Sequence, residues 1–68
     1  MTVGNKYQTM LANLKSVQAD LESFSLESQN QNAKQLFRSC ATETGGIIRR
    51  LEQRWNEVSK EEPSYTQQ

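Results

Sequence analysis

Residues 3–24 read VGNKYQTMLANLKSVQADLESF, a stretch whose apolar and aromatic side chains recur at alternating intervals of four and three residues. This spacing keeps one side of an α-helix apolar along its length, as in the seam of a helix that packs against another helix. We therefore predict a first helix over about residues 3–28. Its predicted seam consists of Val3, Tyr7, Met10, Leu14, Val17, Leu21 and Phe24, with Leu11 beside it.

A second run with the same period follows the polar residues 28–32. Its predicted seam consists of Ala33, Phe37, Cys40, Thr44, Ile47, Leu51 and Val58, widened on one side by Ala41, Ile48 and Trp55. The phase of the repeat changes between Phe24 and Ala33, and a phase break within turn-forming residues indicates a turn. We predict a second helix over about residues 31–60, with Asn30 as its N-cap.

The two ends of the chain extend these helices by a few residues. Thr2 is a candidate N-cap for the first helix, and Pro63 cannot continue the second, so residues 63–68 are expected to form a loose tail. A chain of 68 residues has room for one small domain. The prediction is an all-α fold, a single helical-hairpin domain over residues 1–68 whose two helices run antiparallel.

Self-association is expected from the shape of such a hairpin. Two helices bury only one stripe each, which seldom offsets a conformational entropy of about 1.5 kcal/mol per ordered residue. The apolar side of the second helix, with Phe37, Ile48 and Trp55, is wider than one facing helix can cover. We expect a homodimer that forms a four-helix bundle through these residues. Tyr65 is a further candidate interaction residue, the alternative being simple solvent exposure.

Side chains that could perform chemistry are few. The chain has no histidine and one cysteine, so the ligands of a zinc or di-iron site are missing and no disulfide can form within it. Its acidic side chains lie off the predicted seams, as on a solvated face, and Cys40 is expected to pack as a small apolar residue. Eight basic residues balance eight acidic ones, which argues against nucleic acid as a partner. We expect no enzymatic activity, no cofactor and no metal.

The pair Gly45-Gly46 is unusual inside a predicted helix, where each glycine costs about 1 kcal/mol relative to alanine. Both glycines fall outside the predicted seam, so close approach of the two helices does not account for them. The sequence leaves two interpretations open, a tolerated kink and a docking surface for a partner.

Membrane association has one candidate, the basic residues Arg49, Arg50 and Arg54. They could bind an anionic lipid headgroup or a small phosphorylated ligand, but acidic residues interleave with them, as on an ion-paired solvated face. The sequence contains no apolar stretch near the roughly 20 residues of a membrane span and no pattern typical of a signal peptide. A cytoplasmic location is therefore the expectation.

Several short motifs resemble a known family. They are Leu11-Ala12-Asn13-Leu14-Lys15, residues 21–27, Ala33-Lys34, Ile47-Ile48 with Leu51-Glu52, and the ending Glu61-Glu62-Pro63-Ser64-Tyr65. Together they are similar to a family of very small proteins from spore-forming Bacillales, defined as a domain of unknown function. Cys40, Gly45-Gly46 and Trp55 depart from the residues usual in that family.

The resemblance implies a helical protein without an established activity, and it supplies no catalytic residues. It also implies a sporulation-linked role, because members are often encoded beside spore inner-membrane proteins, including those of the dipicolinic acid channel. The combined expectation is a structural or interaction module, accessory to a spore membrane complex. The alternative is a peripheral membrane or small-ligand binding protein that uses the arginine patch.

Overall fold

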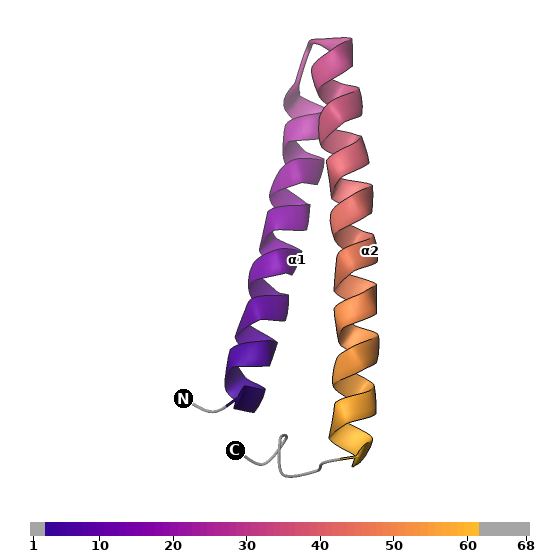
Figure 1. Cartoon of the computed structure of the whole chain (residues 1–68). Helices are drawn as coiled ribbons and strands as arrows, with labels where there is room; N and C mark the ends of the chain where they lie inside the picture. Colours follow the sequence, from indigo (N-terminus) through magenta and orange to yellow (C-terminus); the bar gives the residue numbers. More distant parts are fainter. Residues whose placement is uncertain (1–2, 62–68) are drawn as a thin grey trace.

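The computed structural model describes residues 3–61, with side chains as far as Val58. The described chain forms two helices, α1 (Val3–Glu27) and α2 (Gln31–Glu61), which pack against each other in opposite directions (Figure 1). The prediction of an all-helical pair is confirmed, and each helix ends within one residue of its predicted end. Thr2 and the predicted tail, residues 63–68, lie outside the described residues.

Side-chain hydrogen bonds stabilise the short turn between the helices. The side chain of Asn30 accepts a hydrogen bond from the backbone N–H of Ala33 at 3.0 Å, so Asn30 caps α2 as predicted. At the end of α1, the Lys34 ammonium donates to the carbonyl oxygens of Ser25 and Leu26 at 3.2 and 3.3 Å. These carbonyls have no partner within the helix, and a cation also stabilises the negative end of the helix dipole. Hydrogen bonds from side chains therefore stabilise both the end of α1 and the start of α2.

The side of α1 that faces α2 differs from the predicted seam. Met10, Val17 and Phe24 are 37%, 48% and 53% exposed, whereas Leu11 is buried. The observed seam keeps three predicted members and replaces the others with residues one position later. It consists of Gly4, Tyr7, Leu11, Leu14, Gln18, Leu21, Ser25 and Ser28.

The contact side of α2 is also shifted by one residue from the predicted seam. Ala41 and Ile48 are buried against α1, while Ile47, a member of the predicted seam, is 45% exposed. Cys40 is half-buried beside the seam. The residues expected only to widen this side are thus part of the contact itself. The observed seam of α2 consists of Lys34, Phe37, Ala41, Thr44, Ile48, Leu51, Trp55 and Val58.

Hydrogen bonds explain why polar residues can occupy these seams. The Ser25 hydroxyl donates to the carbonyl of Lys34 at 3.2 Å, and the Gln18 amide donates to the carbonyl of Ala41 at 3.4 Å. A polar group that keeps a hydrogen bond when it leaves water loses little free energy. For α1 the prediction was therefore wrong in assigning only apolar and aromatic residues to the seam.

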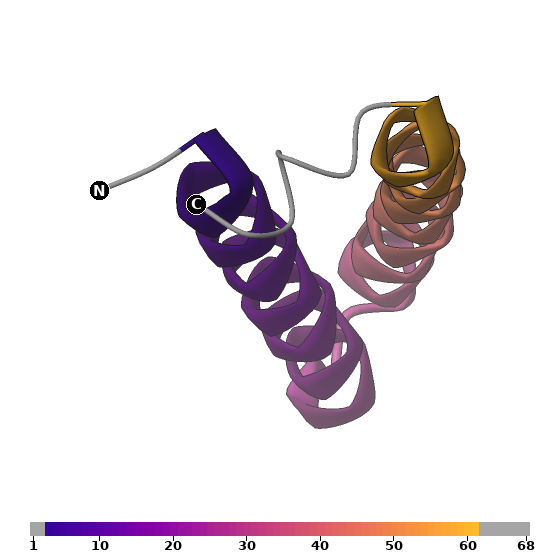
Figure 2. The same cartoon turned by 90° about the horizontal axis from the view of Figure 1, so that it is seen from below.

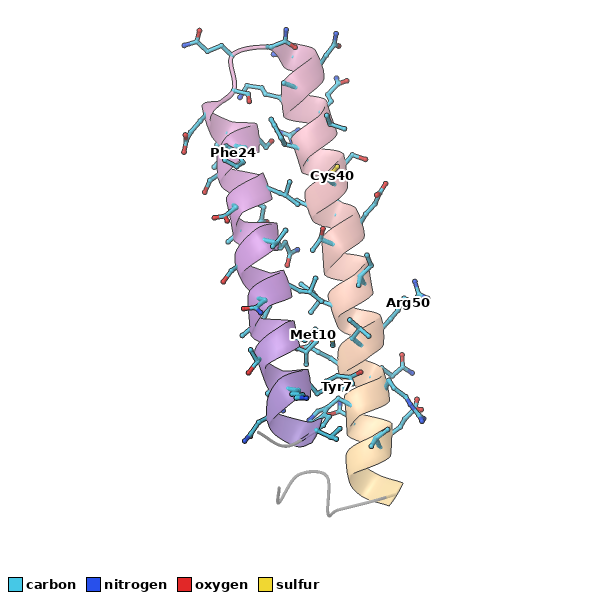
Figure 3. All side chains as sticks on the ribbon, turned by 60° about the vertical axis from the view of Figure 1, so that its left-hand side comes forward. Tyr7, Met10, Phe24, Cys40 and Arg50 are labelled. Carbon is cyan, nitrogen blue, oxygen red and sulfur yellow. The ribbon has the colours of Figure 1, made fainter. Side chains whose placement is uncertain are left out.

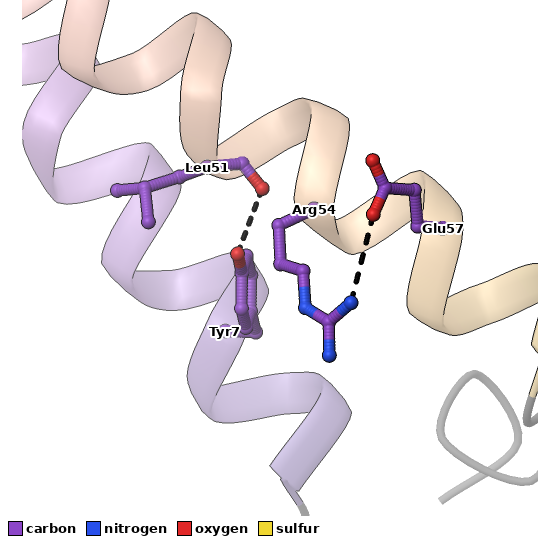
Figure 4. A network of polar contacts seen from close by, with 4 residues as sticks. All are labelled: Tyr7, Leu51, Arg54 and Glu57. Atoms are coloured by element: carbon purple, nitrogen blue, oxygen red, sulfur yellow. Dashed lines mark hydrogen bonds and ion pairs between the residues drawn. The ribbon is translucent and has the colours of Figure 1, made fainter.

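An aromatic pair joins the helices near each end of the hairpin. Phe24 and Phe37 lie near the turn with ring centroids 5.5 Å apart, and Tyr7 and Trp55 lie near the chain ends with ring centroids 5.0 Å apart. The Tyr7 hydroxyl also donates to the carbonyl of Leu51 at 2.7 Å (Figure 4). The helices are close together at the turn and diverge toward the chain ends (Figures 1 and 2).

The two central glycines of α2 have different environments. The helix continues through both, and neither has a positive φ. Gly45 is buried, and a Cβ atom built on it would lie 2.7 Å from Nε2 of Gln18. The prediction that both glycines face away from α1 is therefore wrong for Gly45, which allows the Gln18 side chain to approach the α2 backbone. A Cβ on Gly46 would meet only the Arg49 guanidinium, at 3.8 Å.

Candidate functional site

The paired helices leave two broad faces, one on each side of the seam. One of them is polar. Lys15 of α1 and Glu52 of α2 form an ion pair of 2.9 Å across it. Residues seven or fourteen positions away lie on the same side of each helix, which adds Gln8 and Glu22 of α1 and Arg38 of α2. We call these five residues the polar face.

An open pocket of about 280 Å³ lies on the polar face near the turn. Its lining includes the acidic Glu22, the basic Arg38 and the hydroxyl of Thr42. Opposite charges at one shallow site give no consistent preference for an anion or a cation. Within residues 3–58 there is also no cluster of acidic, cysteine or histidine side chains that could hold a metal ion.

The opposite face is apolar. On α1, four exposed apolar side chains follow one another at intervals of seven residues, and three further apolar side chains of α2 flank the seam on the same side. In an antiparallel pair, the positions across the seam from the polar face share one side. The ring contact of Phe24 with Phe37, at 5.5 Å, joins the two helices on this side. We call this set the apolar face: Val3, Met10, Val17, Phe24, Leu36, Cys40 and Ile47.

This face contains almost all of the large apolar side chains that the described chain exposes. Six of the seven lie on it, and only Leu26 lies elsewhere. Met10 and Phe24 of α1 are labelled in Figure 3, together with Cys40 of α2. Scattered exposed apolar residues are ordinary on a soluble protein, but a continuous patch marks an interaction site. The apolar face is therefore the candidate site.

The charges that border the apolar face differ between its two ends. Toward the turn α1 carries the acidic Asp20 and Glu27, and α2 carries the acidic Glu43 level with Gln18, near the middle of the hairpin. Near the chain ends the charges are mainly basic: Lys6, Arg50, Arg54 and the acidic Glu57, which pairs with Arg54 at 3.5 Å (Figure 4). The face therefore carries a charge gradient along the hairpin.

A family model described as "Protein of unknown function (DUF1657)" matches residues 7–54. The chain belongs to this family. The DUF1657 match covers most of both helices and ends before residues 61–65, so the motif at the end of the sequence is not part of it. Comparison with curated proteins and with solved structures gives no match.

The structure places the four predicted interaction residues in different environments. Ile48 is 4% exposed inside the hairpin, and Trp55 packs on Tyr7. Phe37 is half-buried at the border of the apolar face, and Tyr65 lies outside the described residues. Ile48 is thus covered by the chain itself, and the surface left for a partner belongs mostly to α1. In this DUF1657 chain the exposed stripe on α1 consists of four of the seven residues of the predicted seam.

The three arginines proposed for membrane contact do not form one patch. Arg50 and Arg54 are four residues apart and share a side of α2, whereas Arg49 is turned away from Arg50 by about 100°. All three are exposed, and Arg54 is engaged by Glu57. Neither described helix is long and apolar enough to cross a membrane.

Proposed function

We propose that this DUF1657 chain is a non-catalytic helical module that binds a protein partner through the apolar face. The observation that carries the proposal is the concentration of exposed apolar side chains on one side of the seam, opposite a polar face. Burial of such a surface is the main favourable term in most protein association. The regular spacing of the stripe on α1 fits another helix, which would contact it along its length.

A membrane surface is a less suitable partner for the same face. Arg50, Arg54 and Lys6 beside the apolar residues favour an anionic bilayer, but Asp20, Glu27 and Glu43 border the other half and would be repelled. Co-sedimentation with vesicles rich in anionic lipid at low salt tests this alternative. We expect the protein to stay in the supernatant, and its sedimentation with the vesicles would favour the membrane function.

We also propose where the protein acts, at a membrane complex of the spore. The resemblance described above implies an accessory role at a spore membrane complex, and a module without a membrane-spanning helix in its described part would reach such a complex by binding one of its proteins. We expect the protein to accumulate during sporulation and to fractionate with membranes only when its partner is present. Accumulation in growing cells alone would contradict this setting.

A photo-crosslinking amino acid placed on the apolar face tests the proposed function directly. It is introduced at Val17, and a matched control carries it at Ala19, which is exposed on the same helix but turned by about 200°. We expect irradiation in cells to give covalent protein adducts from position 17 and none from position 19. Equal adducts from both positions, or none from position 17, would contradict an interaction through this face.

A further inference from the structure

We propose that the occupant of the apolar face is a second copy of the chain, inverted end to end and packed face to face. In this dimer α1 lies antiparallel to α1 of the other copy, and α2 lies antiparallel to α2. The inference rests on the proposed function, because it names the partner of the apolar face; a protein of a membrane complex would then contact the dimer through another surface. It differs from the bundle expected from the sequence, in which the side of the second helix carrying Ile48 forms the contact.

The dimensions of the hairpin suit this assembly. The described chain measures 48 by 20 by 10 Å between Cα atoms, so it is a single layer of two helices. Its broad face has an area on the order of 900 Å², comparable to the roughly 800 Å² that each partner contributes to a stable interface of standard size. A second copy would add the missing layer and create a four-helix bundle with the apolar face inside.

The charge gradient selects the inverted orientation. In that orientation Lys6 of one copy lies over the end of α1 that carries Asp20 and Glu27 in the other. Glu43 of α2 is level with Gln18, close to the two-fold axis, so the pairing of opposite charges rests on α1. Opposite charges therefore meet at both ends of the interface, and complementary charges favour one register over another.

The alternative symmetric dimer would keep both turns at the same end and place α1 over α2 of the other copy. Asp20 would then lie near Glu43, and Lys6 would lie near Arg50 and Arg54. Like charges directly opposed across an interface are unfavourable. The gradient thus distinguishes two arrangements that bury the same apolar side chains.

In the inverted dimer the two-fold axis passes near Val17. With the helices fully overlapped, the middle of α1 is residue 15, so the two copies of Val17 lie about 6 Å apart along the helix axis. Phe24 is nine residues from the middle of α1, and a rise of about 1.5 Å per residue separates its two copies by about 27 Å along the axis. This difference gives the orientation a direct test.

The first experiment compares Val17→Glu with the control Ala19→Glu in the full chain. Both variants add one carboxylate to an exposed position of α1, but only the first places two carboxylates near the two-fold axis. We expect the wild-type protein and the control to show twice the monomer mass of 7.8 kDa by sedimentation equilibrium. Val17→Glu should weaken dimerisation by at least about 100-fold, because opposed like charges cost several kcal/mol. A folded wild-type monomer at 100 μM, or equal weakening by both variants, would overturn the proposal.

The second experiment fixes the orientation with engineered cysteines in a Cys40→Ser background. A disulfide requires Cα atoms about 4.4–6.8 Å apart. Under mild oxidation we expect Val17→Cys to give a disulfide-linked dimer and Phe24→Cys to give none. Cross-linking at position 24 but not at position 17 would overturn the inverted arrangement.

The two proposals can fail separately. If position 17 gives photo-adducts in cells whose mass matches another protein and never a second copy, the interaction module stands and self-pairing is overturned. If position 17 gives no adduct and the purified chain is monomeric, both are overturned. Adducts with twice the mass of the chain support both.

Discussion

Replacing Gly45 and Gly46 singly with alanine should have different effects on stability, although the two residues are neighbours in the same helix. A Cβ on Gly46 would make only an ordinary contact with the Arg49 guanidinium, at 3.8 Å. A Cβ on Gly45 would lie 2.7 Å from Nε2 of Gln18, so the Gln18 amide would have to move. The pair therefore separates the helix preference of alanine from the packing between the helices.

The magnitudes follow from these contacts. Alanine is favoured over glycine inside a helix by about 1 kcal/mol, and Gly46→Ala should retain this gain in full. A gain of this size raises the melting temperature of a small domain by about 4–8 °C. In Gly45→Ala the moving amide gives up its 3.4 Å hydrogen bond to the carbonyl of Ala41. Such a bond contributes about 0.5–1.5 kcal/mol, so the net change should lie within about 0.5 kcal/mol of zero.

Urea unfolding followed by circular dichroism provides the measurement. All variants are compared at one protein concentration, since association shifts the apparent stability of a folded state. The control is Gln18→Ala, a background in which Gly45→Ala should recover its helix gain. Equal stabilisation by the two alanines in the natural background would refute the close approach of Gln18 to Gly45.

Three further changes test the hydrogen bonds and the ion pair that join the helices. Asn30→Ala removes the N-cap of α2 and should cost about 1 kcal/mol of unfolding free energy, whereas Asn30→Asp should cost much less. Tyr7→Phe keeps the aromatic packing but removes the hydrogen bond to the Leu51 carbonyl, which should cost about 0.5–1.5 kcal/mol by urea unfolding. The exposed pair of Lys15 with Glu52 should contribute at most about 1 kcal/mol in a double-mutant cycle, and 0.5 M salt should reduce this coupling energy. A coupling energy unaffected by salt would contradict solvent exposure of this pair.

The features that could be predicted from the sequence are local ones. A period of alternating four and three residues can be recognised within a single helix, without knowledge of its partner. The change of phase at residues 28–32 then separates the first helix from the second. Asn30 could be assigned as a cap because its short amide side chain reaches the first turn of any helix that follows it. None of these inferences depends on which side of each helix meets the other.

The side of contact could not be predicted because it depends on the partner helix. Residues 3, 10, 17 and 24 are more hydrophobic than residues 4, 11, 18 and 25, so hydrophobicity alone selects the first set. The second set contains Ser25 and Gln18, whose suitability rests on carbonyl groups of α2 within hydrogen-bond distance. Such partners become visible only when the two helices are docked. For the same reason the sequence does not reveal the apolar face, because hydrophobicity alone places its α1 stripe in the interior.

Because polar residues occupy part of the seam while apolar residues remain on the surface, the hairpin gains little free energy from burial in its interior. Only Leu11, Ala41 and Ile48 are buried apolar residues within the described part of the hairpin, while larger side chains such as Phe24 and Val17 remain in contact with water. Three buried side chains contribute little against the conformational entropy of the ordered residues in α1 and α2. Covering the apolar face would therefore supply stabilisation that the interior lacks. Folding and association should then be coupled, so the unfolding midpoint of the wild-type protein should rise with protein concentration, and that of Val17→Glu should not.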